Sequence, residues 1–287
     1  MIIVTGATGQ LGGAILRALV QRVPASEVGA STRDPEKAAG LSELGVRVRK
    51  GDFSQPESLA HAFEGATQVL LISSNAAAFG GDALAQHQSA IVAARAAGAR
   101  RIVYTSHMAA SSTSAFPPAR DHAATEEMLR ASGLAWTSLR DGFHAASAAW
   151  MLAESLKTGT HAAPEDGKVC WTAHADLAEA AAAILADEGR FDGPTPALTG
   201  NELLDFSDLT QIAGELLGRP IQRKTLTNAE FESKLGASGA PPGVAAISLG
   251  FYRASQSGEF ARIDPTLEQL IGRRPRSMRE LLQKQLQ

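Results

Sequence analysis

At residues 1–13 the chain reads MIIVTGATGQLGG, and this stretch decides the fold. Its first five residues are an apolar, β-branched run typical of a buried strand, and residues 14–20 repeat apolar side chains at helical spacing. The glycines between them are spaced G-x-x-G-x-x-G, so the stretch predicts a strand, a glycine turn and a helix. A helix start of this kind presents free N–H groups and the positive end of the helix dipole to an anion.

Each glycine of this turn has its own predicted role. Gly6 takes a tight turn closed to residues with a Cβ, Gly9 lets a diphosphate approach the backbone, and Gly12 lets the helix pack against the strand. The strand before the turn and the helix after it make the dinucleotide-binding interpretation specific. The predicted binding segment comprises Gly6, Thr8, Gly9, Gln10, Leu11 and Gly12. The alternative is a glycine-rich turn that holds no ligand.

The composition excludes several classes of protein. A net charge of -3 gives no basic footprint for nucleic acid. The single cysteine, Cys170, forms neither an intrachain disulfide nor a zinc cluster, so no metal is expected. No apolar run approaches the roughly 18 residues of a membrane span, and the chain starts inside a predicted strand, which leaves no room for a signal peptide. We therefore expect a soluble, cytoplasmic protein that binds neither nucleic acid nor membrane.

Strands and helices alternate along the first half of the chain, which predicts a Rossmann-type α/β fold with a doubly wound parallel sheet. Further strands are predicted at residues 27–31, 46–50, 68–72, 101–104 and 135–140, with helices at 86–97 and 122–131. Residues 1–142 are the predicted dinucleotide-binding domain. Residues 143–287 are predicted to form a smaller C-terminal α/β cap that partly completes the sheet and covers the substrate.

The end of the second predicted strand bears on the choice of cofactor, because it meets the adenosine ribose in a fold of this kind. An acidic residue there would bind the 2′-OH of NAD, but this chain has Arg33, whose planar fork suits a 2′-phosphate. Lys37 lies one helical turn further on. We therefore predict NADP as cofactor, with NADPH preferred over NADH. The alternative is that both cations are solvated at a helix start.

Polar side chains at the other strand ends complete the predicted cofactor site. Asp52 and Phe53 follow the third strand, Ser73 and Ser74 follow the fourth, and Thr105 follows the fifth. Ligands of parallel sheets bind beyond these carboxyl ends. Asp52 either caps the next helix or belongs to the adenine pocket, and both roles are compatible.

The segment after the fifth strand supplies the catalytic candidates. Ser106 stands where short-chain dehydrogenases carry a serine, and those enzymes place Tyr-x-x-x-Lys at the start of the next helix. Counting back from residues 125–129 puts Pro118 at the tyrosine position and His122 at the lysine position. We predict that Ser106 orients the reactants and that His122 donates a hydrogen bond to the acceptor. The alternative for His122 is an uninvolved surface histidine.

Several segments together resemble the NmrA-like atypical short-chain dehydrogenases, and in particular their NAD(P)H:quinone oxidoreductase and triphenylmethane reductase branch. The resemblance spans nearly the whole chain, through residues 4–12, 33–37, 104–106, 126–129, 132–133, 139–143 and 270–273. It implies an NADPH-dependent reductase of quinones or related electrophiles. That branch carries an asparagine and often a tyrosine at the positions of Asp141 and His144, so this chain departs from it beside the substrate.

The missing tyrosine fits a quinone acceptor chemically. A quinone that receives a hydride becomes a stabilised anion, whereas a ketone becomes an alkoxide that needs a positioned acid. Phe143, His144 and Trp150 are the predicted substrate contacts, with the two aromatic rings stacking on a flat acceptor. The alternative is that Phe143 and Trp150 are core aromatics.

Two other functions compete with the reductase. An NmrA-like, non-catalytic sensor would bind NADP and a regulatory protein, and loss of the tyrosine and lysine suits it equally. A nucleotide-sugar epimerase or dehydratase would need the Tyr–Lys pair, which this chain lacks. The predicted partner is a small quinone-like molecule, and the sequence leaves a homodimer open.

Overall fold

A computed structural model describes residues 1–286, and its largest element is a seven-stranded sheet. The strands of this sheet are β1 (Ile2–Val4), β2 (Val28–Thr32), β3 (Arg47–Lys50), β4 (Gln68–Leu71), β5 (Arg101–His107), β6 (Ala135–Asp141) and β10 (Gly193–Pro194). They are ordered β10-β6-β5-β4-β1-β2-β3, and all neighbours pair in parallel. The predicted Rossmann-type sheet is confirmed.

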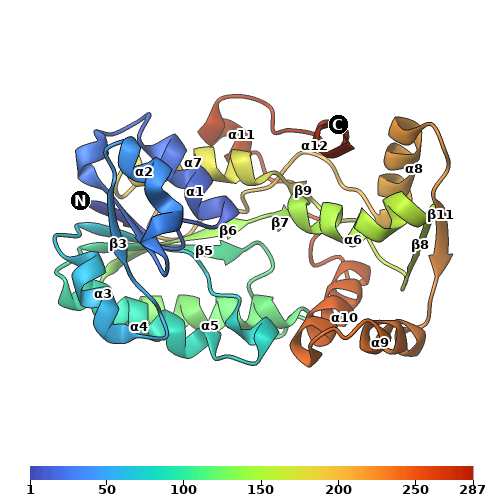
Figure 1. Cartoon of the computed structure of the whole chain (residues 1–287), viewed down its shortest axis with the longest axis horizontal. Coiled ribbons are helices and arrows are strands. Elements are labelled where there is room, and N and C mark those ends of the chain that lie inside the picture. Colours follow the sequence, from blue (N-terminus) through green and yellow to red (C-terminus); the bar gives the residue numbers. More distant parts are fainter. Residues whose placement is uncertain (287) are drawn as a thin grey trace.

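Helices cover both faces of this sheet (Figure 1). One face carries α1 (Gln10–Leu19), α2 (Ala39–Glu43), α7 (His174–Ala186) and α11 (Thr266–Ile271). The other carries α3 (Pro56–Phe63), α4 (Ala83–Ala96) and α5 (Pro117–Ala131). Each set of helices covers a hydrophobic core of its own. In β1, Ile2 and Val4 point into the first core, under α1 and α7, and Ile3 points into the second, under α3 and α4, because side chains alternate along a strand. Within residues 1–286, no helix has both the length and the apolar character needed to cross a membrane.

Helix α5 begins five residues before its predicted start at 122. Pro117 occupies its first turn, where proline is favoured because its missing N–H would have no intrahelical partner. Residues 111–116 form the irregular loop that precedes it. The earlier start places His122 in the second turn of the helix, alongside β5.

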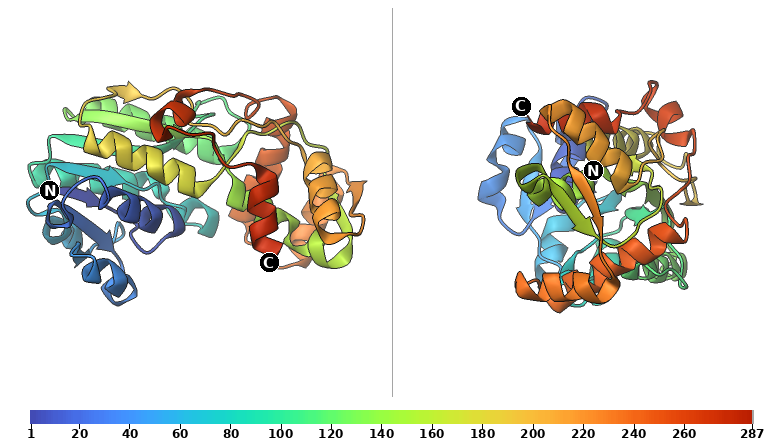
Figure 2. Two further views of the ribbon diagram at one scale, coloured as in Figure 1. Left: turned by 90° about the horizontal axis from the view of Figure 1, so that it is seen from above. Right: turned by 90° about the vertical axis from the view of Figure 1, so that its right-hand side faces the viewer.

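A third core lies at one end of the molecule, beside the large sheet (Figure 2). It is built on aromatic rings, among them Phe143, Trp171, Phe206, Phe251 and Phe260. Around it are β7 (Phe143–His144), β8 (Thr160–Ala163), β9 (Trp171–Thr172), β11 (Gln222–Thr225), α6 (Ala145–Thr158), α8 (Phe206–Leu217), α9 (Asn228–Ala237), α10 (Pro242–Gln256) and α12 (Met278–Leu286). Strands β7 and β9 pair in parallel, as do β8 and β11. Residues after 143 contribute to the third core and also to the large sheet, because β10 pairs with β6 and α7 packs against one face of the sheet.

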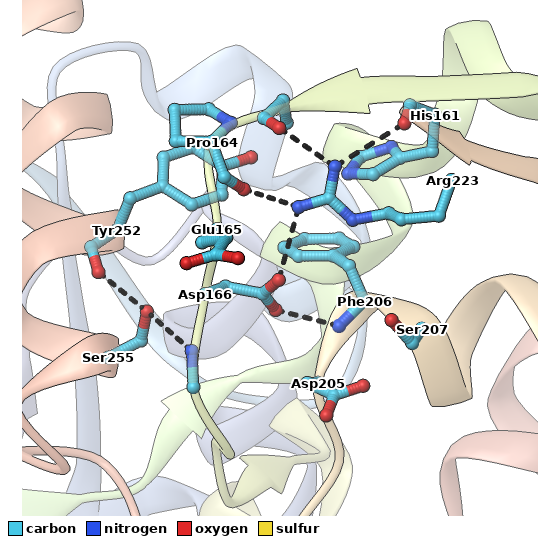
Figure 3. Close-up of polar contacts among 12 residues, drawn as sticks. His161, Pro164, Glu165, Asp166, Asp205, Phe206, Ser207, Arg223, Tyr252 and Ser255 are labelled. Atoms are coloured by element: carbon cyan, nitrogen blue, oxygen red, sulfur yellow. Dashed lines mark hydrogen bonds and ion pairs between the residues drawn. The ribbon is translucent and has the colours of Figure 1, made fainter. Parts of the chain in front are cut away.

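An arginine ties this end of the molecule together (Figure 3). The guanidinium of Arg223 on β11 donates to the carbonyl oxygens of Ala163, at 2.8 Å, and of Pro164, and contacts Asp166 Oδ1 at 3.2 Å. The other oxygen of Asp166 accepts from the backbone N–H of Phe206 at 2.7 Å, at the start of α8. The loop after β8 is therefore fixed to β11 and α8 at once.

Candidate functional site

The turn between β1 and α1 has the geometry that its glycines predict. Gly6 adopts a φ of 60°, in the left-handed region that favours glycine. A Cβ on Gly12 would lie 2.3 Å from the carbonyl oxygen of Gly6, so only glycine lets the helix start this close to the turn. No side chain caps α1 at Gly9, and its first N–H groups have no intrahelical partner. The helix start is thus open to an anion.

A cavity of about 680 Å³ opens in front of this helix start. Eight of the predicted cofactor residues line it: Gly6, Thr8, Gly9, Arg33, Asp52, Phe53, Ser73 and Ser74. The exits of β1, β2, β3 and β4 all contribute, as expected at the carboxyl edge of a parallel sheet. The glycine cradle and the elongated lining across four strands fit a dinucleotide.

Four of the predicted cofactor residues lie just outside this cavity. Gln10 and Lys37 line an adjoining hollow of about 390 Å³, which shares Thr8 and Gly9 with the cavity. Leu11 is buried in the core beneath α1, and Gly12 packs against the turn. These two residues offer a ligand only their backbone N–H groups. Lys37 Nζ pairs with Asp34 Oδ2 at 3.2 Å, whereas Arg33 is exposed at the cavity wall.

Asp52 lines the cavity but does not cap the next helix. Gln55 is the N-terminal cap position of α3, so the expectation that Asp52 caps this helix is wrong. Its Oδ1 accepts instead from the backbone N–H of Ser54 at 2.9 Å, which shapes the loop at the cavity rim. This local hydrogen bond is favoured over capping of α3 because a short acidic side chain readily accepts from a backbone N–H two residues further along its own loop.

The loop after β4 is held by the predicted Thr105 and by two side chains that the sequence did not single out. Thr105 Oγ1 accepts from the N–H of Ser73 at 2.8 Å, so Thr105 supports the cavity wall without lining it. His87 Nε2 accepts from the N–H of Ser74 at 2.8 Å. Gln86 hydrogen-bonds Ser74 Oγ at 2.5 Å and Ser54 Oγ at 2.9 Å, and so bridges two loops at the rim. Neither Gln86 nor His87 belongs to a motif, which is why sequence reasoning missed them.

Cavity-lining residues beyond the prediction continue the same loops or come from a short helix. Asn75 directly follows the predicted Ser73 and Ser74, so its position was a usable signal. Phe79 ends the 3-10 helix η3 (Ala76–Phe79) and is 69% exposed, which places an apolar ring at the cavity mouth. The other short 3-10 helices are η1 (Ala25–Glu27) and η2 (Pro35–Ala38).

Ser106 belongs to a buried polar network. Its hydroxyl donates to Glu126 Oε1 at 2.8 Å, as does that of Ser138, and Arg140 contacts Glu126 Oε2 at 2.7 Å. Burial opposes ionisation of Glu126, but the hydrogen bonds from Arg140, Ser138 and Ser106 outweigh it and lower the pKa of the carboxyl. The Ser106 hydroxyl is therefore committed to a carboxylate that fixes α5 against β5 and β6.

His122 is half-buried and stands beside the end of β5. Its Nδ1 lies 2.7 Å from the hydroxyl of Tyr104, and burial lowers its pKa to about 3. The ring of His107, the residue after Ser106, is stacked on it at a centroid distance of 6.0 Å. Pro118 sits in the first turn of α5, so no phenol stands at the usual acid position. His122 near pH 7 is a neutral hydrogen-bonding group.

The predicted substrate residues have three different environments. Phe143 is buried in the third core, and its ring meets that of His107 edge-on at 5.4 Å. His144 lies 4.4 Å from the ring of His174, and burial lowers its pKa to about 3. Trp150 is 67% exposed on α6. His107, which sequence reasoning missed although it follows Ser106, contacts both His122 and Phe143.

Asp141 marks the position where the chain departs from the resembling branch. It ends β6 opposite His107, and its side chain is buried. Burial raises the pKa of its carboxyl well above the ordinary value. A carboxylic acid held neutral resembles an amide in shape and in having both a donor and an acceptor.

Comparison with known proteins places this site in a family. The sequence family described as NAD(P)H-binding matches residues 6–188. Quinone oxidoreductase 2 of Escherichia coli is 36% identical over 276 residues, which cover 95% of this chain and 94% of that protein. An NmrA-like family domain-containing oxidoreductase of Aspergillus flavus is 29% identical over 279 residues, covering 95% and 91%.

Solved structures extend the likeness to the whole fold. The crystal structure of the Escherichia coli NADPH-dependent quinone oxidoreductase complexed with NADPH has a TM-score of 0.92 and 32% identity, and the match covers 100% of both chains. The triphenylmethane reductase of Citrobacter sp. complexed with NADP(H) has a TM-score of 0.87 and 34% identity, again over 100% of both chains.

Proposed function

The chain belongs to the NAD(P)H-binding family and, within it, to the NmrA-like atypical short-chain dehydrogenases, and on this premise we propose that it is an NADPH-dependent reductase of quinones or similar flat electrophiles. The observation that carries the proposal is the near full-length likeness to a quinone oxidoreductase, joined to a dinucleotide cavity with Arg33 in its wall.

The cofactor end of the site is assigned first. The backbone at Gly6 and Gly9 and the first N–H groups of α1 bind the diphosphate. Arg33 binds the 2′-phosphate, and Lys37 adds positive charge from the adjoining hollow. Thr105 and His87 hold the loop of Ser73 and Ser74 that flanks the bound molecule. NADPH, when bound there, supplies the hydride.

The chain's own residues contribute position rather than acid catalysis. His122 donates a hydrogen bond to the oxygen of the acceptor. The hydrogen bond from Ser106 to Glu126 holds α5 against β5 and so keeps His122 in place. Pro118 stands at the position of the usual acid and cannot protonate a strong base, so the acceptor must become an anion stable enough to be protonated later by water. A quinone meets this requirement and a simple ketone does not. Holding a flat acceptor in place beside the cofactor then supplies most of the rate enhancement.

Steady-state oxidation of NADPH with a panel of benzoquinones and naphthoquinones tests the proposal, with aliphatic ketones and NADH in parallel. We expect quinones to be turned over, ketones to react poorly, and NADPH to be preferred. Rapid turnover of aliphatic ketones would contradict the assigned chemistry. Tight binding of NADPH without oxidation by any electrophile would favour the redox sensor instead.

A further inference from the structure

Tyr104 is a fully buried phenol on β5, and the proposed reaction has given it no role. Its hydroxyl lies 2.7 Å from Nδ1 of His122 across the interface between β5 and α5. Burial raises the pKa of Tyr104 above its ordinary value, so the hydroxyl keeps its proton and remains a donor. A buried donor without an acceptor costs folding free energy, so the Tyr104 hydroxyl must donate a hydrogen bond to a neighbouring acceptor.

The surrounding hydrogen bonds indicate which atom accepts from the Tyr104 hydroxyl. Thr125, the nearby hydroxyl, donates to the carbonyl oxygen of Asp121 at 2.8 Å and bonds His87 Nδ1 at 2.8 Å. Nδ1 of His122 is an acceptor in reach of Tyr104, and a ring that accepts at Nδ1 in its neutral form carries its proton on Nε2. Within residues 1–286, Nε2 of His122 makes no hydrogen bond, so its N–H is available to a ligand.

Tyr104 is itself held from the cofactor side. The ring of His87 meets it edge-on at 5.4 Å. His87 Nε2 accepts from the N–H of Ser74, which lines the dinucleotide cavity, and this bond fixes the proton of His87 on Nδ1, facing Thr125. Contacts therefore run without a break from the cavity wall at Ser74, through His87 and Tyr104, to His122.

We propose that Tyr104 is a positioning residue, whose hydroxyl holds His122 in the Nε2–H tautomer and aims this neutral N–H at the oxygen of the acceptor. The contact between His122 and the acceptor rests on the proposed function. The tautomer of His122 does not, because it follows from the hydrogen bond with Tyr104. A neutral imidazole is a donor that does not compete for a proton, which suits an acceptor whose anion needs stabilisation rather than protonation.

Nitrogen chemical shifts test the tautomer without any turnover. Two-bond ¹H–¹⁵N correlation spectra of protein labelled at histidine would be recorded near pH 7, with the His122 signals identified by their loss in His122→Gln. We expect Nε2 to be protonated and Nδ1 to be an unprotonated acceptor, and Tyr104→Phe to move the ring towards a mixture of tautomers. A wild-type ring protonated at Nδ1 would overturn the proposal, whether or not the protein reduces quinones.

Kinetics test the positioning role. Tyr104→Phe should lower kcat for a quinone by roughly three- to tenfold, the worth of one neutral hydrogen bond, with KM for NADPH unchanged. Tyr252→Phe is the matched control, because Tyr252 is the only other tyrosine, is equally buried and lies in the third core.

A double variant separates positioning from simple support of the fold. In a His122→Gln background the amide offers a donor that does not depend on Tyr104, so adding Tyr104→Phe should cause no further loss. An unchanged kcat in Tyr104→Phe, or a loss that persists in full in the His122→Gln background, would show that Tyr104 acts elsewhere. If Tyr104→Phe does not fold, the wild-type spectrum alone decides.

Discussion

Arg33 is the residue on which the choice between the two nicotinamide cofactors depends. It is exposed at the wall of the dinucleotide cavity, next to Thr32 at the end of β2. Arg33→Ala should weaken NADPH binding by about 1.5–3 kcal/mol, the worth of a hydrogen bond to a charged group. NADH should bind as before, because it has no 2′-phosphate. Titration of both cofactors by tryptophan fluorescence or calorimetry measures the two affinities.

Two controls sharpen this measurement. Lys37→Ala should weaken NADPH binding less than Arg33→Ala, because Lys37 already pairs with Asp34 and lines only the adjoining hollow. Arg22→Ala removes an exposed cation that lines neither hollow and should change nothing. Equal losses for NADPH and NADH in Arg33→Ala would rule out a 2′-phosphate role.

His122 should contribute a hydrogen bond rather than a proton. Its pKa of about 3, set mainly by burial, leaves the ring without an acidic proton to give near pH 7. His122→Ala should therefore lower kcat/KM for quinones by less than the roughly 10²–10⁴-fold typical of losing a general acid. Steady-state kinetics on one quinone and one aliphatic ketone check this. Collapse of activity on both would identify His122 as a replacement for the missing tyrosine.

Side-chain environments show what the sequence can predict at this scale. Residues fixed by a local pattern, such as Gly6 in its turn, have the predicted geometry because the cause lies within a few positions. The partner of His122 is 18 residues away on a strand, so no local pattern reveals it. Phe143 and Trp150 are both aromatic residues near α6, yet one is buried and the other exposed, which depends on what packs against them.

Helix α1 brings a binding role and a folding role into one turn. Gly9 lines the cavity, and a Cβ there would meet only the Gly6 carbonyl oxygen at 3.2 Å. Gly9→Val should therefore weaken NADPH binding strongly while changing thermal stability little. Gly12 lines neither the cavity nor the adjoining hollow, but a Cβ there would clash at 2.3 Å with the same oxygen, so Gly12→Ala should destabilise the fold by about 1–3 kcal/mol.

The two variants are each other's control. Thermal unfolding without cofactor should show the loss in Gly12→Ala and not in Gly9→Val. NADPH titration should show the reverse order, once the fraction of folded Gly12→Ala protein is taken into account. Unaltered NADPH affinity in Gly9→Val would mean that the dinucleotide lies elsewhere.

Inner strands of the large sheet, such as β1 and β4, are predictable from the sequence because they are buried on both faces and read as short apolar runs. The third core is harder to foresee. Its strands are two to four residues long, and its helices come from widely separated segments held by contacts such as Arg223 to Asp166. Such an assembly leaves no strong periodicity in any one segment.

Considered as a whole, the molecule keeps most of its seven histidines neutral inside the fold. Burial lowers the pKa of His87 and His161 to about 4, and of His122 and His144 to about 3. In the unfolded chain these groups would titrate near 6.5, so between about pH 4 and 6.5 the unfolded chain binds more protons than the folded one. The stability that these histidines provide is thus complete above about pH 6.5 and is lost as the pH falls.

The free energy of unfolding should therefore decrease between about pH 7 and pH 5, by up to about 1.4 kcal/mol per pH unit for each such histidine. Asp121, Asp141 and Asp166, whose pKa burial raises, oppose this trend but are fewer than the histidines. Urea unfolding at several pH values measures the slope. His87→Gln should reduce the slope, because protonating His87 would break its bond from Ser74, whereas exposed His61→Gln should not. Stability that is flat or rises towards pH 5 would show that the histidines are not held neutral.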